Sequence, residues 1–280
     1  ARSEHAPTVA GGWRWLGAGG GRGDEAHQLV VAPAKVLVES GALEGGLHLG
    51  QQARHMVAGK GGIENLLNTG SENGTRWIPA EVDVSIRPGW FYHAKEDSLV
   101  KSPEKLFEIY LTSVGRGSTL LLNIPPDRRG LIHQNDVAAL KTLRALLDET
   151  FKTNLAEKAN VSASLVRGDA KQYAAANVSD KNPETYWTLN DNDTSGMIEF
   201  AFDKPQLVKY VMLQEYIKLG QRVKSFVIEA KAGDTWNVIG EGTTIGYKRI
   251  VKVEPIETTA VRITIRDAKA CPVISNIELY

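Results

Sequence analysis

Two patterns of hydrophobic and polar positions alternate between residues 80 and 151. The stretch AEVDVSI, residues 80–86, carries a polar side chain at every second position from Glu81 to Ser85, which predicts a strand with one polar face. The stretch TLLLNI, residues 119–124, is apolar over most of its length, which is typical of a strand buried on both faces in a parallel sheet. A stretch with helical spacing of apolar residues follows each strand, at Ser102–Val114 and Asn135–Phe151. This order predicts a βα-repeat architecture.

The first predicted helix carries clear start signals. Ser102 is expected to be the N-cap, Pro103 occupies the first helical position, and Glu104 lies in the first turn. The second helix has an apolar stripe that we expect to face a core, comprising Val137, Leu140, Leu143, Leu147 and Phe151.

The pattern changes after about Ala156. From there to Tyr280, short alternating runs such as SGMIEFAF and RVKSFVIEAKA are separated by turn signals. Repeated short strands of this kind predict a β-sandwich.

The first 62 residues fit neither pattern. Residues 1–70 hold 15 of the 27 glycines, and no Phe or Tyr precedes Phe91. The stretch GAGGGRG could be a phosphate-binding loop, but such a loop needs a following helix, and the next stretch, DEAHQLVVAP, soon meets a proline. The alternative is a poorly ordered, glycine-rich irregular segment, because glycine loses more backbone entropy on folding than other residues.

Composition excludes several classes of protein. Lys plus Arg equals Asp plus Glu, at 33 each, so no strong field attracts nucleic acid or an anionic membrane. A single cysteine, Cys271, excludes an internal disulfide. No apolar run reaches the roughly 18 residues of a membrane-spanning helix. The N-terminal stretch ARSEHAPTVAGG has no apolar core of a signal peptide.

The segment NGTRWIPAEVDVSIRPGWFYH, residues 73–93, combines a polar strand face with a cluster of aromatic and imidazole side chains. Aromatic rings can cover the apolar faces of a sugar while polar groups bond its hydroxyls, so the segment suits a sugar site. An amphipathic edge strand that ends in a structural aromatic corner explains the same residues.

The motifs NLLNTGSENG, GTRWIPAEVDVSIRPGWFYH and SVGRGSTLLLNIPPDRRGLIHQND occur in the order seen in α-L-fucosidases of glycoside hydrolase family 29, and residues 63–155 resemble that family. The resemblance implies part of a (β/α)8-like, TIM-type barrel, with active residues at the carboxyl ends of its strands. It also implies a retaining mechanism with an aspartate nucleophile and a glutamate acid/base. By resemblance Trp90 lines the fucose pocket.

The opening stretch RWLGAGGG resembles the family's acid/base motif, but Ala18 and Gly19 stand where Asn and Glu are expected. The nucleophile segment of the family is not identifiable, so neither catalytic residue is assigned. The residues expected to contact substrate are Trp90, His93, Glu81 and Arg14. A one-base shift in the coding DNA for residues 25–41 could encode RRTNWSSLRRKYWWNPG, which has the aromatic character expected there, so residues 1–62 are hypothesised to be frameshifted barrel sequence.

Residues 156–280 resemble the discoidin or coagulation factor 5/8 type C domain, a galactose-binding-like jelly roll, through AANVSDKNPETYW and the closing NIELY. The resemblance implies one structural calcium, and the matching oxygen ligands are Asp180, Asn182, Thr185 and Glu278. A simple polar turn is the alternative. Trp187 and Trp236 are expected in the core, which leaves Tyr216 and Tyr247 as loop candidates for sugar contact.

We therefore expect a multidomain chain, an incomplete (β/α)8-like barrel remnant at 63–155 followed by a β-sandwich at 156–280. The expected function is that of a fragment of a retaining α-L-fucosidase that acts on fucosylated glycans or oligosaccharides, itself inactive and without a catalytic cofactor. The alternatives are a non-catalytic carbohydrate-binding protein and an adhesion protein built on the β-sandwich. The expected location is secreted or periplasmic, with neither a nucleic-acid partner nor a membrane span.

Overall fold

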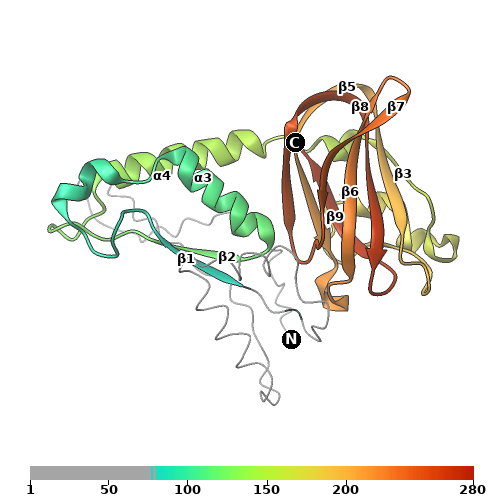
Figure 1. Cartoon of the computed structure of the whole chain (residues 1–280), viewed down its shortest axis with the longest axis horizontal. Helices are drawn as coiled ribbons and strands as arrows, with labels where there is room; N and C mark the ends of the chain where they lie inside the picture. The colour runs from blue at the N-terminus through green and yellow to red at the C-terminus, as the bar shows by residue number, and fades with distance from the viewer. Residues whose placement is uncertain (1–76, 78–79) are drawn as a thin grey trace, which may run out of the picture. The chain divides into compact units, whose positions relative to one another are not determined.

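The structure is a computed structural model that describes Trp77 and residues 80–280 (Figure 1). The predictions for residues 1–62, including the glycine-rich segment, the frameshift hypothesis and Arg14, lie outside the described residues.

Two parallel strands and two helices form the first described part of the chain, residues 80–151. Strand β1 (Glu81–Ser85) pairs with β2 (Thr119–Asn123) in register from Glu81 opposite Thr119 to Ser85 opposite Asn123. The helical elements are η2 (Ala94–Leu99), α3 (Pro103–Thr112), η3 (Val114–Arg116) and α4 (Gln134–Thr150). The predicted order of strand, helix, strand and helix is therefore confirmed.

Helices α3 and α4 cover one face of this strand pair. Their buried residues form one cluster with the residue that follows β1, and its members are Ile86, Leu106, Ala139, Leu143 and Leu147. The side chain of Leu121, in the middle of β2, is 46% exposed. The prediction that β2 is buried on both faces is therefore wrong, because an apolar run along a strand does not by itself provide the neighbouring chain that would cover both of its faces.

The start of α3 is as its sequence predicts. The Ser102 hydroxyl accepts a hydrogen bond from the Lys105 N–H at 3.2 Å, and Pro103 is the first residue of the helix. Helix α4 differs from its prediction in one residue. Asp136, which is not part of the predicted apolar stripe, is fully buried beside it.

The second described part of the chain contains short helical turns and mostly antiparallel strands. Its strands are β3 (Asn160–Ala163), β4 (Trp187–Thr188), β5 (Gly196–Glu215), β6 (Val223–Ala232), β7 (Thr235–Gly242), β8 (Arg249–Ala268) and β9 (Val273–Leu279). Its 3-10 turns are η4 (Leu155–Lys158), η5 (Arg167–Asp169), η6 (Lys171–Tyr173), η7 (Ala175–Ser179) and η8 (Ile217–Leu219).

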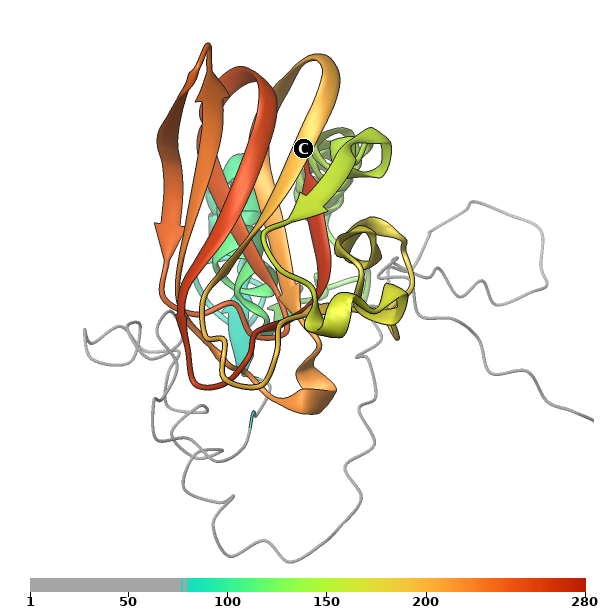
Figure 2. The same ribbon diagram turned by 90° about the vertical axis from the view of Figure 1, so that its right-hand side faces the viewer.

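The strand order within the described residues is β4-β9-β5-β8-β6-β7, with β3 also paired to β5. Strands β5 and β8 are 20 residues long and pair with register shifts near Ala201 and Val208. Figure 2 shows both long strands bending over at one end, so that each continues from one side of the sheet to the other. This large antiparallel sheet is consistent with the predicted β-sandwich.

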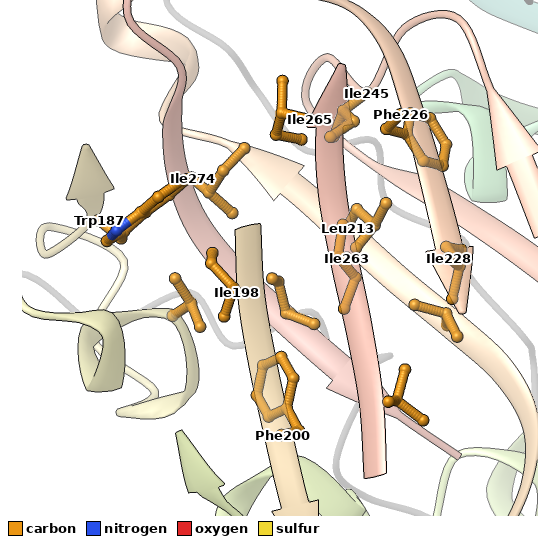
Figure 3. Packing of buried hydrophobic residues seen from close by; sticks show 14 of the residues in the cluster. Trp187, Ile198, Phe200, Leu213, Phe226, Ile228, Ile245, Ile263, Ile265 and Ile274 are labelled. Carbon is orange, nitrogen blue, oxygen red and sulfur yellow. The ribbon is translucent and has the colours of Figure 1, made fainter. Parts of the chain in front are cut away.

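The core of this part is aliphatic and aromatic (Figure 3). Trp187 is fully buried in it, as predicted, and its indole N–H donates to the Leu165 carbonyl at 2.9 Å. Trp236 does not belong to the buried cluster, so its expected core position is wrong. Trp236 is partly exposed on β7, where its ring packs against the Arg262 guanidinium at 4.4 Å, and that guanidinium pairs with Glu229 on the adjacent strand.

Aromatic side chains join the two described parts. The Phe151 ring, directly after α4, lies 5.1 Å from the Tyr280 ring and 5.8 Å from the Tyr210 ring. Phe107 of α3 meets Tyr210 edge-on at 6.1 Å. Such pairs add a specific geometric preference to the apolar area that they bury.

Candidate functional site

A turn of the chain, residues 86–93, follows the carboxyl end of β1 and carries Trp90 and His93; we call it the Trp90 turn. The last residue of each parallel strand holds it. The Ser85 hydroxyl donates to the Gly89 carbonyl at 2.7 Å, and the Asn123 side-chain amide donates to the Trp90 carbonyl at 2.9 Å. The same amide bonds the Ser85 hydroxyl at 3.1 Å, so the two strand ends fix the turn jointly.

Trp90 remains accessible although its backbone is held. Its side chain is 48% exposed, and the side chain of Phe91 is 79% exposed. An exposed indole on a backbone that is hydrogen-bonded at several points presents a flat apolar surface at the end of a parallel strand pair, where ligands bind in α/β folds.

One residue of this turn is a buried arginine. Arg87 is fully buried, and its guanidinium binds the fully buried Asp136 carboxylate at 2.8 Å and the Asp97 carboxylate at 2.9 Å. Burial alone would lower the pKa of Arg87, but the hydrogen bonds to Asp136 and Asp97 outweigh it and raise that pKa. A buried cation with two carboxylate partners ties the turn firmly to helix α4.

Asp97 also contacts hydrogen-bond donors in the turn and near the start of α4. Its carboxylate accepts from the Tyr92 hydroxyl at 3.3 Å and lies 3.4 Å from the His133 Nε2. The Asn135 side chain donates to the Asp97 carbonyl at 2.8 Å. Because His133 Nδ1 accepts the Asn135 N–H, the neutral imidazole carries its proton on Nε2, which faces Asp97. Burial and the Asp97 charge raise the pKa of Tyr92.

The structure separates the predicted substrate-contacting residues. Trp90 and His93 lie in one turn, whereas Glu81 is the first residue of β1, about 13 Å of strand before Ser85. Arg14 lies outside the described residues. Arg87 is not among the residues predicted from the sequence. Its one signal was Asp136 next to the apolar stripe of α4, since a carboxylate that is buried beside such a stripe needs a partner.

The open face of the strand pair also carries an unpaired polar atom. Asp83 lies opposite Leu121 in the parallel register, on the side away from the helices. One of its carboxylate oxygens is buried and has no hydrogen-bond partner within the part of the chain that the structure describes. Leaving a buried polar atom without a hydrogen bond costs free energy, so this oxygen is unsatisfied within the described segment.

The predicted calcium ligands fall into two groups. Asp180 accepts the Asn182 N–H at 2.8 Å and the Thr185 hydroxyl at 2.7 Å, so these three residues close one turn. Glu278 lies on β9, where its carboxylate accepts from the side chains of Asn276 and Tyr280. Among the described residues, no group of three or more His, Cys, Asp or Glu is arranged to hold a metal. The calcium site stays a prediction.

The described residues include no helix that is long and apolar enough to cross a membrane.

Comparisons with known proteins identify two family segments. Residues 56–150 match the Alpha-L-fucosidase family model, and residues 158–279 match the F5/8 type C domain model. Both predicted resemblances are therefore confirmed.

Curated relatives and solved structures agree with these matches. The chain is 39% identical over 213 residues to "Putative alpha-L-fucosidase 1" of Oryza sativa subsp. japonica and 35% identical over 215 residues to "Alpha-L-fucosidase 1" of Arabidopsis thaliana, in each case over 75% of this chain. A Ruminococcus gnavus GH29 fucosidase in complex with fucose matches at 37% identity with a TM-score of 0.71, over 75% of this chain and 43% of that one. The chain spans 41% and 42% of the length of the two curated relatives.

Proposed function

Because this chain joins a segment of the alpha-L-fucosidase family to an F5/8 type C domain, we propose that it is part of a retaining α-L-fucosidase and that its Trp90 turn forms one wall of the fucose pocket. The observation that carries this proposal is the Trp90 turn itself. Its indole is exposed, while the ends of two parallel strands hold its backbone through Ser85 and Asn123. A match to a fucosidase whose structure contains fucose supports the same ligand.

The turn supplies binding chemistry of two kinds. The indole face of Trp90 would cover the apolar C–H groups and the methyl group of fucose, as aromatic rings do in sugar sites. His93 is exposed three residues further on and offers a donor and an acceptor to sugar hydroxyls.

Hydrolysis needs more than this turn. A retaining glycosidase uses two carboxyl groups about 5 Å apart on opposite faces of the anomeric carbon. Glu81 and Asp83 lie on one strand face, about 6.6 Å apart between Cα atoms, so they would approach a sugar from the same side. We therefore propose that this chain binds fucose but does not hydrolyse fucosides by itself.

Titration of the chain with L-fucose tests the binding proposal. We expect saturable binding by calorimetry, with loss of affinity in Trp90→Ala. Trp236→Phe is the control, because it also removes an indole but lies in the β-sandwich under Arg262. Equal affinity of the wild-type protein and Trp90→Ala would show that the turn is not the fucose site.

An aryl α-L-fucoside assay tests the catalytic part. We expect no turnover above background for the wild-type chain. Turnover that Glu81→Gln abolishes would contradict both the inactivity of the chain and the assignment of Glu81 as a non-catalytic residue.

A second candidate function, glycan binding by the β-sandwich, has one observation in its favour. The rings of Tyr173, Tyr186 and Tyr216 contact one another in series in tilted arrangements, with centroid distances of 5.6 Å and 4.8 Å. Glu184 accepts from the Tyr216 hydroxyl and pairs with Lys218 beside the same ring. We propose to screen the full chain on a glycan array against Tyr216→Ala and Trp90→Ala, since loss of binding in Tyr216→Ala alone would assign it to the β-sandwich.

A further inference from the structure

Two kinds of contact hold the Trp90 turn. On the strand side, the contacts of Ser85 and Asn123 go to backbone carbonyls. On the helix side, the side chains of Arg87 and Tyr92 both reach the Asp97 carboxylate. Asp97 therefore meets the turn on both sides of Trp90, through Arg87 before it and Tyr92 after it.

Asp97 lies in a short element that has little else to hold it. The 3-10 helix η2 (Ala94–Leu99) has no buried residue and no side-chain cap. Hydrophobic burial therefore cannot fix its position, because an element without buried side chains gains little from the core. Its polar contacts to the start of α4 come through Asp97, which meets His133 at its carboxylate and Asn135 at its carbonyl.

The two carboxylate partners of Arg87 have different roles. Asp136 is fully buried and binds the guanidinium through both of its oxygens, so Arg87 keeps a partner when Asp97 is removed. The side chain of Asp97 is 29% exposed, so water can replace part of its contacts. Loss of Asp97 is therefore expected to release the turn locally and to leave the helix core intact.

We propose that Asp97 is a positioning residue for the fucose site: it fixes the orientation of the Trp90 turn relative to α4 without touching the ligand. This rests on the proposed function of the Trp90 turn. Misplacement of a binding surface by about 1 Å can change a site's performance strongly, so a residue that sets the orientation affects affinity without contact.

The test compares Asp97→Ala and Asp97→Asn with wild type in the full chain. Asp148→Ala is the matched control, because Asp148 is also an aspartate paired with an arginine, Arg144, but lies on the exposed side of α4. The readouts are amide hydrogen exchange over residues 87–99, the melting temperature, and the affinity for L-fucose by calorimetry.

In Asp97→Ala we expect exchange over residues 87–99 to rise at least about tenfold and fucose affinity to fall by about tenfold, because the Arg87 and Tyr92 side chains both lose this carboxylate partner. The melting temperature should match that of Asp148→Ala. Asp97→Asn keeps an acceptor for the Arg87 guanidinium and is expected to restore part of the affinity.

Two results would overturn the proposal: unchanged exchange over residues 87–99, or increased exchange with unchanged fucose affinity. If the wild-type protein does not bind fucose, the proposed function fails, and hydrogen exchange alone decides whether Asp97 positions the turn.

Discussion

Glu215 and Gly246 bind each other through two reciprocal hydrogen bonds. The Glu215 N–H donates to the Gly246 carbonyl at 2.9 Å, and the Gly246 N–H donates to the Glu215 carboxylate at 2.7 Å. Glu215 is 2% exposed, and the other oxygen of its carboxylate accepts the N–H groups of Arg222 and Val223 at 2.6 and 2.9 Å. One buried side chain therefore joins the end of β5, the start of β6 and the turn before β8.

The turn that contains Gly246 also contacts the part of the chain that matches the fucosidase family model, residues 56–150. The Tyr247 ring lies 5.8 Å from the Trp77 ring. A Cβ atom at Gly117 would come within 3.3 Å of the Lys248 backbone, and Gly117 has a φ of 80°, a conformation that favours glycine. By binding Gly246, Glu215 thus helps to position Tyr247 and Lys248, which contact residues 56–150.

Replacement of Glu215 by Gln is expected to lower the free energy of unfolding by about 1–3 kcal/mol, the usual cost of leaving a buried donor unpaired. An amide has one acceptor oxygen, so its NH₂ group would face one of the three backbone N–H donors. Urea denaturation measures the change, with Glu257→Gln as the exposed control on β8. Equal midpoints for the two variants would show that the three contacts contribute little.

Stability should also depend on pH through Glu215. Burial raises the pKa of Glu215 from 4.5 to about 7, against the opposing effect of the three N–H donors. The folded protein holds this proton more tightly than the unfolded chain does, so the contribution is present below about pH 4.5 and is lost as the pH rises through 7. The stability of wild type relative to Glu215→Gln should fall over that range. A difference independent of pH would contradict the shift.

Asp127 should give stability the opposite pH dependence to Glu215, with a loss of stability as the pH falls. Its carboxylate accepts from the Arg129 guanidinium at 2.6 Å and from the Arg129 N–H at 2.8 Å. The guanidinium, with backbone N–H groups, lowers the pKa of Asp127 from 3.8 to about 2. Its stabilising effect is therefore present above pH 3.8 and is lost as the pH falls through 2. Circular dichroism between pH 5 and 2 should show wild type losing its advantage over Asp127→Asn.

Phe151→Ala should loosen the contact between the two described parts. Phe151 meets Tyr210 and Tyr280 across this contact. Because Phe151 is only partly buried, we expect a loss of about 2–4 kcal/mol, at or below the cost of truncating a fully buried phenylalanine. Calorimetry should resolve two transitions where wild type shows one. The exposed Phe91→Ala is the control, and a single unshifted transition in Phe151→Ala would refute the coupling.

The predicted calcium site gives a direct thermal test. A ligand that binds only the folded state raises its stability, so the melting temperature should be higher in calcium than in chelator. Glu278→Gln should reduce this difference, because calcium affinity depends on the number of charged ligands. A wild-type melting temperature that calcium does not change would remove Asp180 and Glu278 from consideration as ligands.

Local patterns in the sequence were enough to predict much of the fold. The alternation from Glu81 to Ser85 predicted β1, and Ser102 with Pro103 predicted the start of α3. These features depend on neighbouring residues, so a single sequence displays them. The prediction for β2 failed on one point, since the exposure of Leu121 depends on what covers the sheet and not on the strand's own apolar run.

The sequence alone was enough to predict the strand–helix order of residues 80–151, the two family segments and the place of Trp90 in the turn that follows β1. Only the tertiary structure decided which polar groups support that residue. Arg87 and Asp136 are 49 positions apart, and Glu215 and Gly246 are 31 apart. The physical reason is that a buried charge needs partners in space, and the folding of distant segments brings those partners together without any periodic pattern along the chain.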